Sequence, residues 1–279
     1  MKKKHKWSTF VLLLVFFIGL SVMLYPAIST YWNSKTQSEA IVDYEKMLSS
    51  IPEKDYTELF KSAEDYNKSL AKLDFPLLDY NRVDGYFDIL DISGTGMMGF
   101  ITIDVIGVEL PIYHGTDNNV LSTAAGHIQG TSFPIGGVGT HSVISAHRGL
   151  PTATLFTNLD HMEIGDIFEV TVLDRTFTYQ VDQIKTVDPT DTADLLIEAD
   201  KEYCTLLTCT PYGINTHRLL VRGVKVDSIR QRTVIVTSDA HQIEPLIVTP
   251  IVALPILFTL MMIVLFKPVK KDDLGDDTE

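Results

Sequence analysis

Cysteine is nearly absent from this chain of 279 residues, which contains only Cys204 and Cys209. Two cysteines cannot form the set of disulfides that stabilises a small secreted domain, so the fold must depend on a hydrophobic core. An odd spacing along one strand directs the two side chains to opposite faces, so we expect no disulfide between them. Cys204 lies inside an apolar run and is interpreted as a small hydrophobic residue. Cys209 is a free thiol that needs another explanation.

Basic residues are also few, since 23 Lys and Arg against 36 Asp and Glu give a formal net charge of −13. Seven basic residues lie at 1–6 and 267–271, and five acidic residues lie at 272–279, which leaves 16 basic and 31 acidic residues and a net charge of −15 between them. Nucleic-acid binding requires a basic stripe, so nucleic acid is excluded as a partner. The histidines lack HExxH or similar spacing, and we expect neither a metal nor an organic cofactor.

Two apolar runs stand near the ends of the sequence. Residues 10–28 follow a lysine cluster, and residues 246–266 precede the sequence KPVKK. Each run is long enough for a transmembrane helix, which needs about 20 residues. Lysines on both outer flanks predict a multi-pass protein of the cell membrane with both termini in the cytoplasm and an extracellular middle region. The alternatives are a cleavable signal peptide at the first run, or two buried core helices.

The predicted secondary structure changes along the middle region. Residues 30–72 show apolar residues at helical spacing, broken at Pro52, which predicts two helices. Residues 73–88 have no regular period and indicate a loop. From Gly99 onward, short β-branched runs separated by turns predict seven or eight strands in a closed or sandwiched all-β domain, with helical stretches at 153–162 and 191–199. The predicted segments are 1–29 (cytoplasmic cluster and anchor), 30–90 (membrane-proximal helices and loop), 91–227 (β domain), 228–245 (linker), 246–266 (second span) and 267–279 (cytoplasmic tail).

Cys209 directly follows the apolar run YCTLLT and stands two residues before a Pro-Tyr-Gly turn. The thiolate is the nucleophilic form of cysteine, and a catalytic cysteine usually has a histidine that takes and returns its proton. His147 fits this role because it closes the strand SVISAH at a turn, where catalytic side chains are often displayed. Arg218 or Arg222, on the following strand, could hold a developing oxyanion. The alternatives are a packed cysteine, a hydrogen-bonded histidine and solvent-exposed arginines.

Several longer stretches resemble one family. TLLTC at 205–209 matches the TLxTC signature of sortases, the membrane-bound cysteine transpeptidases of Gram-positive bacteria. Other stretches are similar to the class C, pilus-assembling branch in particular, over about residues 86–226. They are TPYGINTHRLLVRG after Cys209, MGFITIDVIGVELPIYHGT (98–116), GHIQGTSFPIGG (126–137) and HSVISAHRGLP (141–151).

The resemblance implies an eight-stranded β-barrel with short helices, preceded by N-terminal helices and a lid, and flanked by two transmembrane helices. It implies that His147, Cys209 and Arg218 are the catalytic residues, with a structural role for Arg222. The implied substrate is a pilin with an LPxTG-type sorting signal, which is cleaved after its threonine. A lysine amine of the next pilin then accepts the thioacyl group. His147 protonates the departing amine and Arg218 stabilises the oxyanion or positions the peptide.

Many class C sortases carry a lid with an Asp-Pro-aromatic motif over the active site. The loop at 73–88 lies where such a lid is expected, although its order is Asp74-Phe75-Pro76. We predict that Asp74 approaches Arg218 and that the Phe75 ring covers Cys209, the alternative being an ordinary linker.

Two other functions stay open at this point. The first is a sortase that anchors proteins to the cell wall through a peptidoglycan amine, and the second is a non-enzymatic, membrane-tethered binding module. Papain-like proteases are disfavoured because their cysteine precedes the histidine, and the caspase signature is absent. A calcium loop at 91–102 is disfavoured because Thr102 stands where a bidentate glutamate is needed.

Overall fold

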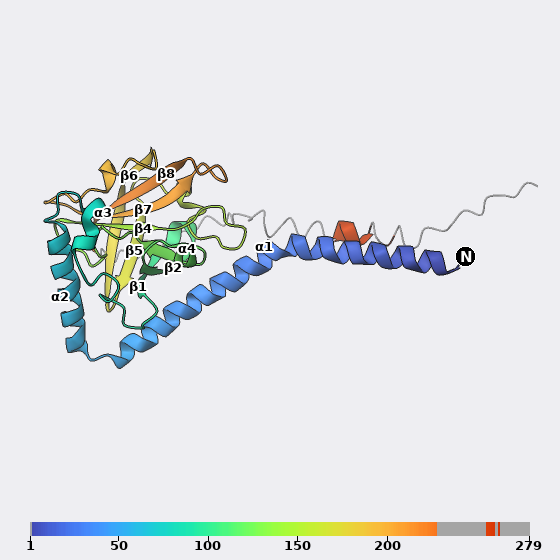
Figure 1. The fold of residues 1–279 in the computed structure, drawn as a ribbon, viewed down its shortest axis with the longest axis horizontal. Helices are drawn as coiled ribbons and strands as arrows, with labels where there is room; N and C mark the ends of the chain where they lie inside the picture. Colours follow the sequence, from blue (N-terminus) through green and yellow to red (C-terminus); the bar gives the residue numbers. More distant parts are fainter. Residues whose placement is uncertain (1, 228–254, 260–261, 263–279) are drawn as a thin grey trace, which may run out of the picture. The chain divides into compact units, whose positions relative to one another are not determined.

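A computed structural model describes residues 2–227, 255–259 and 262 (Figure 1). The chain divides into two compact units, one formed by Ser29–Thr233 and the other by Met1–Ile28 with Val234–Glu279. The first predicted apolar run lies in helix α1, Lys2–Ser50. Within the described ranges, one helical stretch, Leu13–Leu48, is long and apolar enough to cross a membrane. The predicted second run, 246–266, lies outside the described residues except for 255–259 and 262, which are helical.

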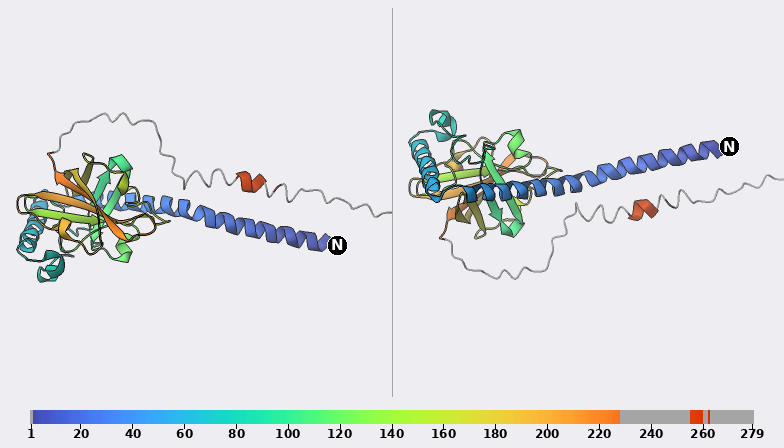
Figure 2. Two further views of the ribbon diagram at one scale, coloured as in Figure 1. Left: turned by 90° about the horizontal axis from the view of Figure 1, so that it is seen from above. Right: turned by 90° about the horizontal axis from the view of Figure 1, so that it is seen from below.

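Two helical segments precede the strands in the unit Ser29–Thr233, as predicted. α1 ends at Ser50 and α2 spans Glu53–Leu70. Pro52 separates them as the N-cap of α2, because a proline inside a helix removes a backbone hydrogen bond. The apolar face of α2 packs into the main core through Phe60, Ala63, Tyr66 and Leu70. The helix therefore lies along one side of the barrel (Figures 1 and 2).

Two buried polar side chains fasten these helices to the rest of the unit. The Tyr44 hydroxyl of α1 donates to the Met98 carbonyl at 3.0 Å and accepts from the Leu173 amide at 2.9 Å. The Asn67 side chain of α2 donates to the Phe133 carbonyl at 3.2 Å and accepts from the Phe133 amide at 2.8 Å. Both side chains satisfy backbone groups that burial would otherwise leave unpaired.

Eight strands close into a barrel, which confirms the predicted fold. The order around the barrel is β1-β2-β3-β4-β7-β8-β6-β5. The strands are β1 Met97–Ile103, β2 Val108–His114, β3 Ala125–His127, β4 Thr140–Ser145, β5 Ile167–Val172, β6 Arg175–Val187, β7 Glu202–Thr210 and β8 His217–Lys225. Most neighbours pair antiparallel, whereas β3 is parallel to β2 and β7 is parallel to β4.

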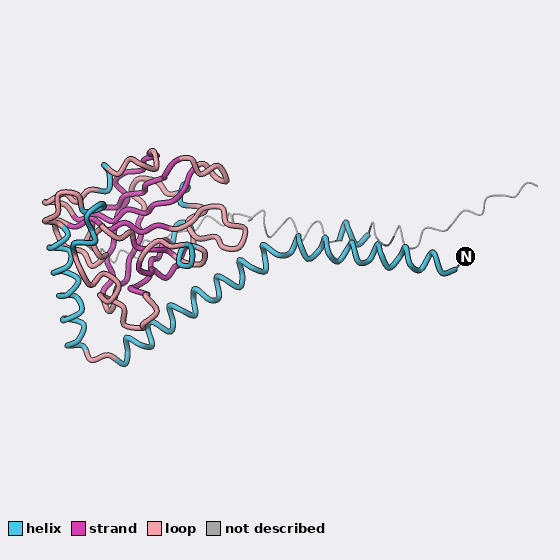
Figure 3. Tube along the Cα trace, in the orientation of Figure 1, coloured by secondary structure: helices cyan, strands magenta, loops and turns pink. Residues whose placement is uncertain are grey.

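The short helices differ from the sequence prediction in three places (Figure 3). The prediction of a helix at 153–162 is wrong, because that stretch contains turns and only a 3₁₀ helix at Leu159–His161. There the Phe156 amide donates to the His147 carbonyl at 3.1 Å. The stretch at 191–199 contains a 3₁₀ helix at Ala193–Leu195. The loop at 73–88 contains α3 and a 3₁₀ helix. The remaining short helices are α3 Pro76–Asp79, α4 Asn118–Leu121 and 3₁₀ helices at Tyr80–Arg82 and Asp104–Ile106.

The wall formed by β4, β7 and β8 carries apolar residues on both of its faces. On β7, Cys204 and Leu206 belong to the main core inside the barrel. The opposite face carries a separate group that we name the outer-face cluster, namely Val143, Val187, Leu195, Leu207 and Leu220. Leu207 and Leu220 of this cluster lie on β7 and β8, the strands that carry Cys209 and Arg218, whereas Val187 lies on β6 and Leu195 in a 3₁₀ helix.

Candidate active site

Strand register brings the predicted nucleophile and the predicted arginine side by side. Cys209 on β7 is directly opposite Arg218 on β8 in the antiparallel ladder. Opposite residues on one face of an antiparallel pair have Cβ atoms about 4.5–5.5 Å apart, so the two side chains are neighbours.

The predicted histidine, His147, lies on the segment that pairs with the other side of β7, at the position along the strand that Cys209 occupies. β4 runs parallel to β7, with Ser145 opposite Leu207. His147 lies two residues beyond Ser145, and Cys209 lies two residues beyond Leu207. The alignment continues past the end of β4, because the Ala146 amide donates to the Leu207 carbonyl at 3.2 Å. His147 and Arg218 therefore flank Cys209 on adjacent segments.

The two cysteines lie on opposite faces of β7, and both are free thiols. Cys204 is fully buried in the main core, and this burial raises the pKa of its thiol well above the ordinary value. Cys209 shares the face of Leu207 and is partly exposed. Only Cys209 is therefore placed to meet a substrate.

Arg218 and Arg222 have different surroundings. The Arg222 guanidinium pairs with both carboxylate oxygens of Asp182, at 3.0 and 2.7 Å, and lies 4.2 Å from the centre of the Tyr203 ring. Arg218 donates only to the Asn215 and His217 carbonyls, at 3.3 and 3.0 Å, and has no ion pair among the residues that the structure describes. The guanidinium beside Cys209 thus keeps the capacity to bind a further oxygen.

Arg148 connects the segment of His147 to the segment of Cys209, a role that the sequence analysis did not anticipate. Its guanidinium donates to the Thr210 hydroxyl at 3.2 Å and forms an ion pair with Asp160. Thr208 adds a second link, since its hydroxyl donates to the Ala146 carbonyl at 2.8 Å. Neither residue has a distinctive sequence pattern, because both contacts depend on the pairing of β4 with β7.

Two other histidines on this side of the fold are buried and neutral. His127 donates from Nε2 to the Ser132 carbonyl at 2.8 Å and accepts at Nδ1 from the Tyr86 hydroxyl at 3.0 Å, and burial lowers its pKa to about 3. His141 donates from Nδ1 to the Leu196 carbonyl at 2.9 Å and accepts at Nε2 from the Thr205 hydroxyl at 2.7 Å. Burial also lowers the pKa of His141. Both imidazoles are fully hydrogen-bonded and hold backbone segments in place.

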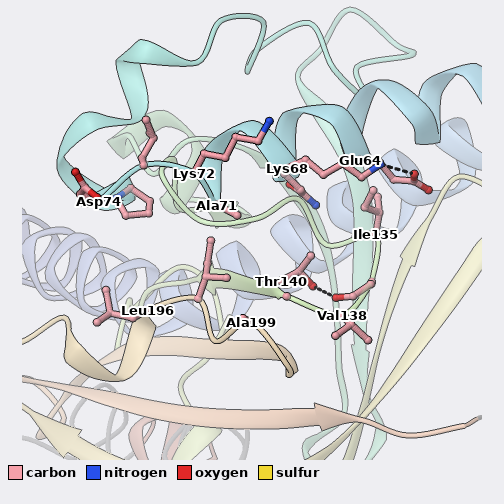
Figure 4. Close-up of a pocket in the computed structure, with 17 residues that line it drawn as sticks. Glu64, Lys68, Ala71, Lys72, Asp74, Ile135, Val138, Thr140, Leu196 and Ala199 are labelled. Atoms are coloured by element: carbon pink, nitrogen blue, oxygen red, sulfur yellow. Dashed lines mark hydrogen bonds and ion pairs between the residues drawn. The ribbon is translucent and has the colours of Figure 1, made fainter.

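One residue of the segment predicted as a lid contacts the outer-face cluster. Leu77 of α3 packs against the cluster, whereas Phe75 is 63% exposed. Asp74 is exposed and lines a pocket with Leu196 and Ile197 (Figure 4). Arg218 forms no ion pair with Asp74 in the part of the chain that the structure describes, and the predicted lid roles of Asp74 and Phe75 stay predictions.

No group of three or more metal-binding side chains lies together in the described part of the chain. What the site brings together is a partly exposed thiol, an imidazole and an unpaired guanidinium. These are the groups that acyl transfer through a thioester needs.

Comparisons with known proteins agree with this arrangement. Residues 101–226 match the sortase domain family. Sortase D of Bacillus subtilis (strain 168) is 31% identical over 131 residues, which is 46% of this chain and 63% of that protein. The alignment thus spans somewhat less than two thirds of this curated relative.

Solved structures cover a larger part of the chain. Sortase C1 from Streptococcus agalactiae is 47% identical, with a TM-score of 0.62, and the match covers 68% of this chain and 98% of that one. A pilus-related sortase C of Group B Streptococcus is 40% identical, with a TM-score of 0.60, covering 67% of this chain and 97% of that one. Since almost the whole of each solved chain aligns at these identities, the protein belongs to the sortase family of cysteine transpeptidases, in its class C branch.

Proposed function

We propose that the protein is a transpeptidase that joins pilin subunits through Cys209. The observation that carries this proposal is the register of three adjacent segments, which sets Cys209 between His147 and Arg218. The substrate is a pilin with an LPxTG-type sorting signal, and the acceptor is a lysine amine of the next pilin. The similarity to a structure described as a pilus-related sortase C supports the pilin as substrate.

The proposed reaction has two halves with a balanced proton transfer. In the first, the Cys209 thiol gives its proton to His147 and attacks the threonine carbonyl. The peptide bond then breaks, and His147 returns the proton to the departing glycine amine. In the second, the lysine amine attacks the thioester carbonyl, His147 takes its proton, and Cys209 leaves and is reprotonated. Arg218 stabilises the oxyanion in each half-reaction, because its fixed positive charge stabilises the negative charge that develops on the carbonyl oxygen.

The proposal includes attachment to the cell membrane by two spans, residues 10–28 and 246–266. Lysines flank both runs on their outer sides, which favours cytoplasmic termini and an extracellular barrel. This orientation would place Cys209 on the side of the membrane where a pilus is assembled.

Intact mass spectrometry with an LPxTG-type peptide tests the first half-reaction. We expect a thioacyl adduct in wild type and in Cys204→Ala, and none in Cys209→Ala. Removing one oxyanion-binding group lowers a rate by about 10²–10³-fold, so Arg218→Ala should form the adduct about a hundredfold more slowly. His147→Ala should form it at least as slowly.

The acceptor is tested by adding a pilin with its sorting signal, or a peptidoglycan-type amine, to the preformed adduct. Transfer to the pilin lysine supports polymerisation, whereas transfer only to the peptidoglycan amine indicates cell-wall anchoring. Absence of an adduct in every form, across several sorting peptides, would indicate a binding module without catalysis.

A further inference from the structure

A cavity of about 870 Å³ lies away from Cys209, where α2 meets the barrel (Figure 4). One wall is the end of α2 with the first lid residues, including Lys68, Ala71 and Asp74. The other wall is formed by the glycine-rich loop 135–140 and by residues 196–199. A cavity of several hundred Å³ with mixed polar and apolar walls is typical of a ligand site.

Hydrogen bonds hold both loops of this cavity in place. Asn67 binds the amide and carbonyl of Phe133, just before the glycine-rich loop. His141 donates to the Leu196 carbonyl at 2.9 Å, and the Gly139 amide donates to the Lys201 carbonyl at 2.7 Å. The cavity is therefore preformed, which reduces the entropic cost of binding.

The walls suit an extended polypeptide with an apolar side chain. Gly137 has a φ of 109°, and a Cβ there would meet only the Thr140 methyl group at 3.8 Å, so another backbone can approach closely at this position. Val138 and Leu196 line the cavity while remaining 75% and 50% exposed. The net charge of the lining is zero, because the acidic Glu64 and Asp74 balance the basic Lys68 and Lys72. This composition favours an apolar segment over a strongly charged one.

Strand geometry places the cavity in line with the candidate active site. The loop 135–140 leads into β4, whose Thr140 is opposite Glu202 at the start of β7. Cys209 lies seven positions further along β7, a distance of roughly 23 Å at about 3.3 Å per residue. Val143 and Leu207 of the outer-face cluster lie between them on β4 and β7.

The direction of a bound sorting signal follows from its chemistry, and this step rests on the proposed function. The threonine carbonyl must reach Cys209, and the apolar leucine and proline before it fit the outer-face cluster, where Leu77 now packs. The chain upstream of the motif then continues along β7 toward its start. An extended chain covers the distance to the cavity in about seven residues.

We propose that this cavity binds the pilin segment that precedes the sorting motif, about six to nine residues before the cleaved bond. It receives an apolar side chain of that segment between Val138 and Leu196, and the glycine-rich loop accommodates the peptide backbone. The site would make cleavage depend on the pilin as well as on the motif.

Photo-cross-linking with the full-length Cys209→Ala chain in detergent tests the location directly. The probe is an LPxTG-type peptide with a benzophenone amino acid about seven residues before the threonine. We expect cross-links at 135–140 or 196–199, mapped by mass spectrometry. Cross-links elsewhere, or none, overturn the proposal. Because this readout needs no catalysis, cross-links in the cavity without adduct formation by wild type would contradict only the proposed function.

Kinetics with matched peptides test the contribution of the cavity to recognition. Val138→Glu and Leu196→Glu should lower kcat/KM for a peptide with an extended apolar upstream segment by about tenfold, and by less than about twofold for a peptide that begins at the motif. Ile164→Glu, at another apolar position that is 63% exposed, should change neither value. Equal losses for both peptides, or no loss for the long one, would contradict the proposal even if catalysis itself is confirmed.

Discussion

The buried residue His127 makes one contribution to the pH dependence of stability, and His141, whose pKa burial also lowers, contributes in the same direction. Burial lowers its pKa to about 3 in the folded protein, against an ordinary value of about 6.5 when unfolded. Below pH 6.5 the unfolded state therefore binds a proton that the folded state does not bind. The sign follows from linkage, so His127 makes the protein less stable as pH falls from about 6.5 toward 3.

Urea unfolding of residues 29–233 at pH 7 and pH 5 measures this effect. His127 should account for a loss of about 2 kcal/mol between these pH values, since one pH unit corresponds to about 1.4 kcal/mol. The His127→Gln variant should be less stable than wild type at pH 7. Its additional loss of unfolding free energy between pH 7 and pH 5 should be smaller than that of wild type by about 2 kcal/mol. His161→Gln, at an exposed position, keeps the wild-type pH dependence. Identical pH dependence in His127→Gln and wild type would contradict the assignment.

The candidate site residues could be proposed from the sequence, but the contacts that support them could not. Cys209 and His147 each end a β-type run before a turn, and this local pattern is visible without a structure. The choice of Arg218 over Arg222 needed either the family resemblance or the ion pair of Arg222 with Asp182. Arg148 was not predictable, because its contact with Thr210 joins segments 62 residues apart in the chain.

At the scale of elements, seven of the eight strands were predictable, because each contains a run of β-branched residues. β3 was missed because Ala125–His127 contains only three residues and none is β-branched. The helix at 153–162 was predicted wrongly. Leu155 has a positive φ of 43°, which does not occur in a right-handed helix. There tertiary contacts with the His147 segment determine the backbone.

Leu77 makes α3 a cover for the outer-face cluster, and this contact should control access to the neighbouring Cys209. Leu77→Ser removes an apolar contact worth about 1–2 kcal/mol, which raises the open fraction roughly tenfold. The rate of Cys209 modification by a bulky maleimide should rise by a similar factor. Leu78→Ser serves as the matched control, because Leu78 is 78% exposed on the same short helix.

The same assay distinguishes Leu77 from the lid residues expected from the family resemblance. An Asp74→Ala, Phe75→Ala double variant should leave the maleimide rate close to wild type if Leu77 is the covering residue. A faster rate in the double variant, with Leu77→Ser unchanged, would instead support Asp74 and Phe75.

At the scale of the whole molecule, the distribution of charge is the basis for the orientation that we propose relative to the membrane. The basic residues at 1–6 and 267–271 lie outside the two apolar runs, and the region between them has a net charge of −15. Because lysines next to a membrane span tend to stay on the cytoplasmic side, the charges favour insertion of the two apolar runs as a hairpin with both chain termini in the cytoplasm. The acidic middle region carries Cys209 and the cavity that we assign to the pilin.

Thiol labelling on intact cells tests this orientation, with Cys209→Ala as background because Cys204 is buried. A membrane-impermeant maleimide should label Thr216→Cys, at an exposed position after the β7 turn, before any permeabilisation. If the second span that we propose is present, the reagent should label Thr278→Cys only after the membrane is permeabilised, because two spans would return the chain to the cytoplasm. Labelling of Thr278→Cys on intact cells would contradict the proposed second span and indicate attachment through the N-terminal helix alone. Protection of both positions would place the barrel inside the cell, where it could not meet an exported pilin.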